Sequence, residues 1–228
     1  MRTALTAAIG AALAAVVACG GDSTGPAPSR NNPGTGTATL DVTADIDAND
    51  VPGGFSTDFT VSVRDGAGNP VTSATVTFAN PSLGTVTLAE TPAGSGDYFA
   101  NRPSFPAGDF QLDVVRGTDN VRNVVLGGPS VHTITAPAAS ATVPANQSLT
   151  VRWTVPSAAQ SAEVETRDYG PVAGPDNGSF VIPGGNNPAR ADQRIRVFRF
   201  NEVTIAGGLT GSRLRVEVRK TVEPVIVQ

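Results

Sequence analysis

The most constraining feature of this chain is a repeated alternation of apolar and polar residues in short segments. It is clear in residues 37–46 (TATLDVTADI) and 59–65 (FTVSVRD), and later segments rich in Val, Thr and Phe repeat it. A period of two places every second side chain on the same face of a strand. No window of helical length carries apolar residues at positions i, i+3, i+4 and i+7. The chain is therefore expected to be all-β.

The spacing of these segments predicts β-sandwiches. Gly, Pro, Asn or Asp bounds each segment, and about seven strands at roughly 8–12-residue intervals fit between residues 37 and 128. A second β-rich run occupies residues 129–228, and its strand 149–155 places Trp153 inward as a core residue. We expect two tandem β-sandwich domains, 37–128 and 129–228.

The N-terminus has the layout of a secretory signal peptide. Arg2 precedes an apolar run that ends at Ala18, and Cys19, the single cysteine of the chain, follows directly. The sequence Val16-Val17-Ala18-Cys19 resembles the lipobox of bacterial lipoproteins. That resemblance implies that residues 1–18 are removed and that the Cys19 sulfur carries a diacylglycerol.

The expected location follows from this anchor. Two acyl chains hold a protein stably on a membrane, whereas one chain gives only marginal binding. Gly20, rather than Asp, follows the cysteine, and the resemblance then implies export to the outer membrane of the cell envelope, facing the periplasm or the surface. The membrane is thus the expected partner. Residues 19–36 are rich in Gly, Pro, Ser and Asn and are interpreted as a flexible tether.

One motif in this tether matches the pattern of a catalytic signature. Residues 21–25, GDSTG, match the G-x-S-x-G nucleophile elbow. An elbow requires a strand before the serine and a helix after it. Here the lipobox cysteine precedes the motif and Pro26 follows it, so the match is interpreted as a linker sequence.

Two further resemblances suggest the type of each domain. Residues 63–71 (VRDGAGNPV), followed by 74–78 (ATVTF), are similar to invasin/intimin-type bacterial Ig-like domains and to carboxypeptidase regulatory-like domains. The strand 150–154 (TVRWT) and residues 178–183 (GSFVIP) resemble fibronectin-type-III-like or Ig-like modules. These resemblances imply a non-enzymatic structural, adhesive or binding module.

A row of arginines suggests an alternative function. On the last predicted strands, basic and apolar residues alternate, which places on one sheet face Arg194, Arg196, Arg213, Arg215 and Arg219. Such a face could bind a glycan or another envelope polyanion. It could equally be a solvated face with cross-strand pairs to Glu163, Glu165 and Glu217. Between these arginines the alternation breaks at residues 198–200 (FRF), which suggests a β-bulge.

The composition offers little for catalysis or metal binding. One Cys, one His and one Met exclude a Cys/His zinc site and a haem with His/Met ligands, and no cofactor is expected. Calcium would need six to eight convergent oxygens, so the cluster Asp41, Asp45, Asp47 and Asp50 is interpreted as solvated carboxylates, with no metal site predicted. A net charge of −4 argues against nucleic-acid binding.

The single histidine leaves one further alternative. His132 lies in the linker between the two predicted domains, and the spacing of the serines and acids around it does not indicate a Ser-His-Asp triad. We interpret it as a residue that contacts the domain junction, and no catalytic residue is predicted. The alternative is an accessory or degenerate hydrolase, which mutation of His132 would reveal.

Overall fold

The structure, a computed structural model, describes residues 31–228. Over this range the chain forms strands and one 3-10 helix, Gly184–Asn186, so the prediction of an all-β protein is confirmed. No helix within these residues has the length and apolar character needed to cross a membrane. The predicted signal peptide, Cys19 and the GDSTG motif all fall outside the described residues.

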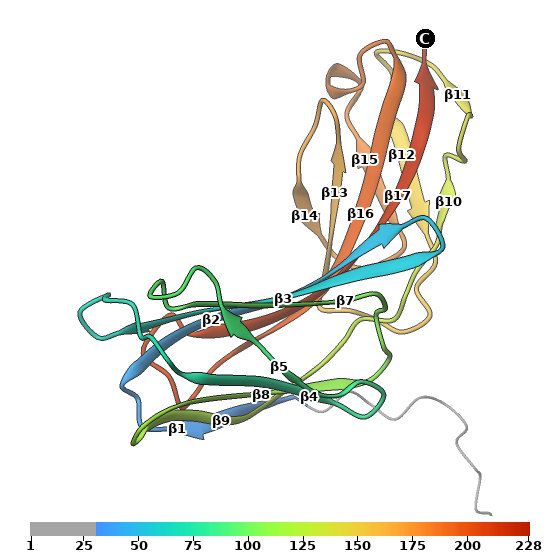
Figure 1. The fold of residues 1–228 in the computed structure, drawn as a ribbon. Coiled ribbons are helices and arrows are strands. Elements are labelled where there is room, and N and C mark those ends of the chain that lie inside the picture. The colour runs from blue at the N-terminus through green and yellow to red at the C-terminus, as the bar shows by residue number, and fades with distance from the viewer. Residues whose placement is uncertain (1–30) are drawn as a thin grey trace, which may run out of the picture.

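The first sandwich packs two sheets face to face, in the lower part of Figure 1. One sheet has the strand order β1 (Asn32–Gly36), β9 (Asp119–Gly127), β8 (Asp109–Arg116), β4 (Thr75–Asn80), β5 (Gly84–Thr87). The facing sheet contains β2 (Leu40–Val51), β3 (Gly54–Asp65), β7 (Asp97–Arg102) and β6 (Ala89–Glu90).

The second sandwich is smaller. A three-stranded sheet has the order β10 (Ile134–Ala136), β12 (Leu149–Trp153), β15 (Ser179–Ile182). The facing sheet has the order β14 (Val172–Gly174), β13 (Ser161–Thr166), β16 (Arg190–Thr204), β17 (Arg213–Val227). The short strand β11 (Thr142–Val143) pairs in parallel with the end of β17.

The long β16–β17 hairpin belongs to both sandwiches (Figure 1). The half formed by the start of β16 and the end of β17 lies in the second sandwich, where β16 pairs with β13. Its other half reaches the first sandwich, where β17 pairs in parallel with β2 from Arg213–Thr43 to Arg219–Asn49. One sheet, with the order β14-β13-β16-β17-β2-β3-β7-β6, therefore runs through both sandwiches.

The hydrophobic cores follow the predicted alternation but not the predicted boundary. Leu40, Val42, Ala44 and Ile46 of β2 are all buried in the first core, as the period of two requires. This core also takes in Ile205, Leu214 and Val216 from the hairpin. The expected boundary at residues 128/129 assumes that each sandwich is closed by its own strands, whereas here β17 covers the open edge of β2.

The start of the first sandwich also differs from the expectation. Residues 32–36, which the composition assigned to the tether, form β1 and pair with β9. Gly34, with φ of +77°, accommodates the backbone of β9 so closely that an added Cβ would lie 2.6 Å from the Arg122 carbonyl oxygen. Glycine here permits close strand pairing, not flexibility.

The turn that carried the first resemblance is a tight polar turn between β3 and residue 70. The Asp65 carboxylate accepts hydrogen bonds from the Ala67 and Asn69 backbone N–H groups, both at 2.9 Å. Gly68 has a φ of +83°, which a residue with a side chain rarely adopts. The hydrogen bonds from Asn69 and the backbone lower the pKa of Asp65.

The second core is built around Trp153, as predicted. The indole is buried among Val151, Val164, Ile182 and Ile195. Its ring N–H still donates a hydrogen bond, 3.0 Å long, to the Asp176 carboxylate.

Candidate functional site

The outward side of the shared sheet is a continuous charged surface. Because Leu214, Val216 and Val218 of β17 point into the core, the alternate residues of β17 and of its neighbours point outward. This surface, called here the charged face, carries Asp45, Asp47, Asp58, Glu163, Glu165, Arg194, Arg196, Glu202, Arg213, Arg215, Glu217 and Arg219. The structure thus brings all five predicted arginines together on one face.

Arg213 pairs with an acid of the adjacent strand β2, whereas Arg215 pairs with one acid on its own strand and one on β13, two strands away. Arg213 donates two hydrogen bonds to the Asp45 carboxylate, at 2.7 and 3.2 Å. Arg215 binds Glu217 at 2.6 Å and Glu163 at 3.4 Å. The Arg215 guanidinium also lies 3.5 Å from the ring centroid of Phe200, a cation–π contact.

The other arginines differ in their pairing. Arg194 and Arg196 converge on the Glu165 carboxylate, at 3.1 and 3.5 Å. Arg219 makes no ion pair within residues 31–228 and lies 5.9 Å from the ring centroid of Phe198. Burial and the neighbouring Arg196 lower the pKa of Arg219. Four of the five arginines are therefore paired with carboxylates, two of them sharing Glu165, which agrees with the interpretation as a paired surface, and polyanion binding stays a prediction.

The predicted bulge at residues 198–200 is wrong. Phe198, Arg199 and Phe200 pair with β17 in unbroken register, and the irregular positions of β16 lie at residues 190–195 instead. The strand still alternates, but here the charged residue is the buried one: the Arg199 side chain points into the molecule. Phe198 and Phe200 lie on the outer side of the sheet, where Arg219 and Arg215 lie over their rings.

Acidic residues on the charged face do not converge on a metal site. Asp45 is held by Arg213, and Asp50 pairs with Lys220 at 2.6 Å. Asp47 lies in register with Glu217 and Asp58; burial and the negative charge of Glu217 raise its pKa to about 6. The part of the chain described holds no group of three or more His, Cys, Asp or Glu residues arranged for a metal ion.

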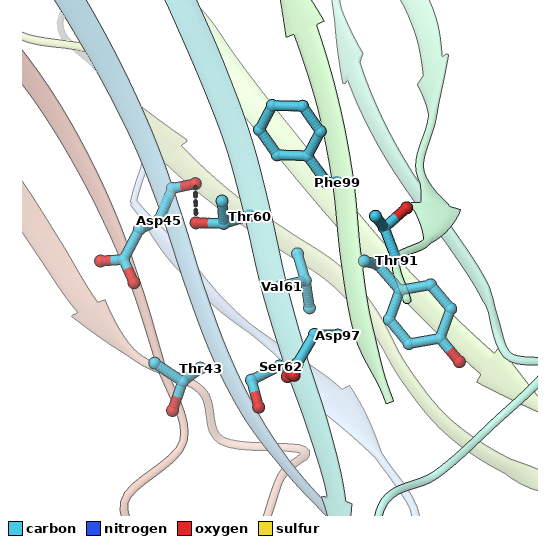
Figure 2. Close-up of a pocket in the computed structure, with 9 residues that line it drawn as sticks. Thr43, Asp45, Thr60, Val61, Ser62, Thr91, Asp97 and Phe99 are labelled. Atoms are coloured by element: carbon cyan, nitrogen blue, oxygen red, sulfur yellow. Dashed lines mark hydrogen bonds between the residues drawn. The ribbon is translucent and has the colours of Figure 1, made fainter. Parts of the chain in front are cut away.

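A hollow lies on this face over β2, β3 and β7 (Figure 2). It encloses about 350 Å³. The hollow, called here the trough, is lined by Thr43, Asp45, Thr60, Val61, Ser62, Thr91, Asp97, Tyr98 and Phe99. Four of these residues carry short hydroxyl side chains, whereas apolar atoms make up most of the exposed lining. The hollow was not predicted from the sequence.

Strand register explains how the trough is assembled. Thr60 of β3 lies directly between Asp45 of β2 and Phe99 of β7. One row further along, Ser62 lies between Thr43 and Asp97 in the same way. Figure 2 shows Phe99 beside Thr60, with the Asp45 side chain directed to the other side of β2. Three strands therefore contribute hydroxyl groups, carboxylates and an aromatic ring to one surface.

His132 is part of the sandwich junction. Its side chain is 1% exposed, and Nε2 lies 3.1 Å from the Val197 carbonyl oxygen. Burial, with the positive charge of Arg199 as a second cause, lowers its pKa to about 4. A buried ring that faces a carbonyl is not presented to a substrate, so the geometry offers the degenerate-hydrolase alternative no support.

The comparisons with known proteins give a fold likeness only. No family model matches the chain, and no curated protein matches it. The Yersinia pseudotuberculosis adhesin InvE is similar with 20% identity over 80% of this chain, which spans 60% of that chain, at a TM-score of 0.27. The fibronectin(III)-like modules of Clostridium thermocellum CbhA are similar with 14% identity over 78% of this chain and 92% of that chain, at a TM-score of 0.28.

Proposed function

We propose that this chain is a non-enzymatic, lipid-anchored binding module of the bacterial cell envelope whose two sandwiches are held in a fixed arrangement relative to each other. The observation that carries the proposal is the β16–β17 hairpin shared by both sandwiches. Modules joined by a single linker are expected to move relative to each other. Here a strand pair crosses the junction in addition to the linker.

Polar contacts at the junction support the same conclusion. Asn201, in the middle of β16, donates a 2.7 Å hydrogen bond to the Gly127 carbonyl at the end of the first sandwich. Arg199 donates to the Ser130 carbonyl in the linker at 2.7 Å. Both donors are buried, and separating the two sandwiches would break both hydrogen bonds, at a cost of about 0.5–1.5 kcal/mol for the Asn201 bond and about 1.5–3 kcal/mol for the charged Arg199 bond.

The hairpin tip also holds the N-terminal strands. Leu209 N–H donates to the Leu40 carbonyl at 2.7 Å, and Ala206 N–H donates to the Pro33 carbonyl at 2.9 Å. Residues 19–31 separate the lipobox cysteine from the first strand, so a lipid on Cys19 would attach the whole two-sandwich unit close to the membrane. We propose that the protein is anchored in the outer membrane and faces either the periplasm or the cell surface.

Rigidity is tested by the distance between two spin labels. Thr118, in the turn between β8 and β9, and Val181, on β15, are both exposed and lie on different sandwiches. Labels on Thr118→Cys and Val181→Cys, in the background Cys19→Ala, should give a single narrow distance distribution by pulsed electron resonance. A broad distribution, as for flexibly joined domains, would contradict the fixed arrangement of the two sandwiches.

Anchoring is tested by labelling cells with an alkynyl palmitate analogue. Cys19→Ala should abolish the label and release the protein from the membrane fraction. Protease treatment of intact cells then separates a surface location, in which the protein is digested, from a periplasmic one, in which it is protected. A label that persists in Cys19→Ala would contradict the anchor.

A further inference from the structure

We propose that the trough binds a neutral glycan chain, with Phe99 as the platform for a sugar ring. The inference rests on the proposed function, since it names the ligand class of the binding module. The trough lies on β2, β3 and β7, beside the arginine row, whose Arg213 binds Asp45 at the edge of the trough.

Phe99 has the position of a stacking platform. Its side chain is 41% exposed, and it is the one aromatic residue among the large hydrophobic side chains exposed in residues 31–228. The preceding residue, Tyr98, is buried, and its hydroxyl donates to the Val71 carbonyl at 2.8 Å, so β7 is firmly held behind the exposed ring. The negative face of an aromatic ring attracts the positively polarised C–H groups of a sugar.

The floor of the trough supplies hydrogen-bonding groups. Thr43, Thr60 and Ser62 are short, half-buried side chains between longer neighbours, and this difference in length makes the hollow. The Thr43 and Ser62 hydroxyls can each donate one hydrogen bond and accept two. The Thr60 hydroxyl already donates to the Asp45 carbonyl oxygen at 3.4 Å and keeps its acceptor positions. Such groups match a ligand that is itself covered with hydroxyls.

The ion pairs on either side of the trough indicate that its ligand is uncharged. Asp45 is bound by Arg213 at 2.7 Å on one side, and Asp97 is bound by Arg64 at 2.8 Å on the other. Because both carboxylates are paired with arginines, the lining offers no unbalanced charge to attract either an anion or a cation. Each carboxylate has about four lone-pair positions, so it can still accept hydrogen bonds from sugar hydroxyls.

The size of the hollow agrees with this ligand class. Ligand pockets usually enclose roughly 300–1,000 Å³, and the trough lies at the low end of that range. It is open along the sheet rather than enclosed, which suits a chain that passes over the surface.

Calorimetric titration with neutral hexasaccharides tests the proposal. The full chain, extracted from membranes in mild detergent, is titrated with cellohexaose, chitohexaose and maltohexaose, and with heparin as the polyanion. At least one neutral hexasaccharide should bind with little dependence on salt. Phe99→Ala should weaken that binding about tenfold. Ser62→Tyr, which fills the floor of the trough, should abolish it.

Matched controls separate binding from folding. Val181→Ala removes an exposed apolar side chain on the second sandwich and should leave the affinity unchanged. Each variant should keep the wild-type far-UV circular dichroism and melting temperature. For Ser62→Tyr a loss of fold would be visible in these spectra, and Phe99→Ala then carries the test alone.

Three results would overturn the proposal. The first is that none of the three neutral hexasaccharides binds. The second is that binding survives both Phe99→Ala and Ser62→Tyr. The third is salt-sensitive heparin binding alone, unaffected by Phe99→Ala, which would assign the ligand to the arginine row. In each case the label on Cys19 and the spin-label distances remain separate tests, so the envelope function can stand while the trough proposal fails.

Discussion

Arg199 and Asp176 form an ion pair inside the junction of the two sandwiches, with 0% and 1% of their side chains exposed. Arg199 Nε lies 2.9 and 3.0 Å from the two Asp176 oxygens, and Asp176 also accepts from the Ala159 N–H at 2.8 Å. Burial opposes ionisation of Asp176, but hydrogen bonds from Arg199, Ala159 and Trp153 outweigh it and lower the pKa. The pair is therefore charged and fully hydrogen-bonded.

Removing one partner of this pair should be severe. Asp176→Asn leaves the Arg199 guanidinium buried without its counter-charge, and we expect a loss of about 3–5 kcal/mol in the free energy of unfolding. Urea denaturation at pH 7 measures it. Glu223→Gln is the matched control, because Glu223 pairs with Arg167 at 3.4 Å on the exposed surface and should change stability by about 0–1 kcal/mol. Equal effects of both substitutions would contradict the role assigned to the buried pair.

His132 should make stability rise with pH. Its folded pKa of about 4 lies below the ordinary value of 6.5. Between these two values the unfolded chain binds more protons than the folded one, so the free energy of unfolding increases with pH, by about 3 kcal/mol across the window. His132→Gln should remove this contribution. Urea denaturation at half-unit steps from pH 4 to 7 measures the slope, and an unchanged slope in the variant would refute the assignment.

Asp47 should act in the opposite sense over nearly the same window. Its folded pKa of about 6 lies above the ordinary 3.8, because burial and Glu217 oppose its ionisation. The folded state then binds more protons between these values, and the free energy of unfolding decreases as pH rises. Asp47→Asn should stabilise the chain at pH 7 by about 1–2 kcal/mol, after allowance for screening at a half-buried site. The same titration should show a steeper rise with pH than the wild type, and no gain at pH 7 would count against the charge conflict.

Much of the local structure was predictable because one rule governs it. The period of two identified the buried positions of β2 and the inward position of Trp153. The same rule failed at Arg199, because alternation tells which residues share a face but not which face meets the core. Arg199 can face inward because Asp176, in the segment between β14 and β15, supplies the opposite charge inside the junction.

Contacts between strands far apart in the chain could not be predicted from the sequence. Arg213 lies beside Thr43 although the two residues are separated by almost the whole described chain. Nothing in either segment specifies this parallel pairing, so the shared hairpin could not be anticipated. The trough was hidden for the same reason: Ser62 and Phe99 belong to separate strands, and their common surface depends on register.

Tyr98 should contribute to the first sandwich through its hydroxyl. The group donates to the Val71 carbonyl at 2.8 Å and accepts from the Ala74 N–H at 2.9 Å, so it ties the segment before β4 to β7. Tyr98→Phe leaves both backbone groups without this partner, and we expect a loss of about 1–3 kcal/mol. Thermal denaturation measures it. Phe99→Ala, on the opposite face of the same strand, is the control and should have a much smaller effect.

The shared hairpin should make the two sandwiches unfold together. Leu214 is buried in the first core, whereas the single tryptophan, Trp153, reports on the second. Leu214→Ala should cost about 2–5 kcal/mol. Because β17 also forms part of the second core, we expect the Trp153 fluorescence transition in urea to shift to lower concentration and to coincide with the transition in far-UV circular dichroism. If the sandwiches were independent, Leu214→Ala would leave the Trp153 transition in place, and the two probes would separate.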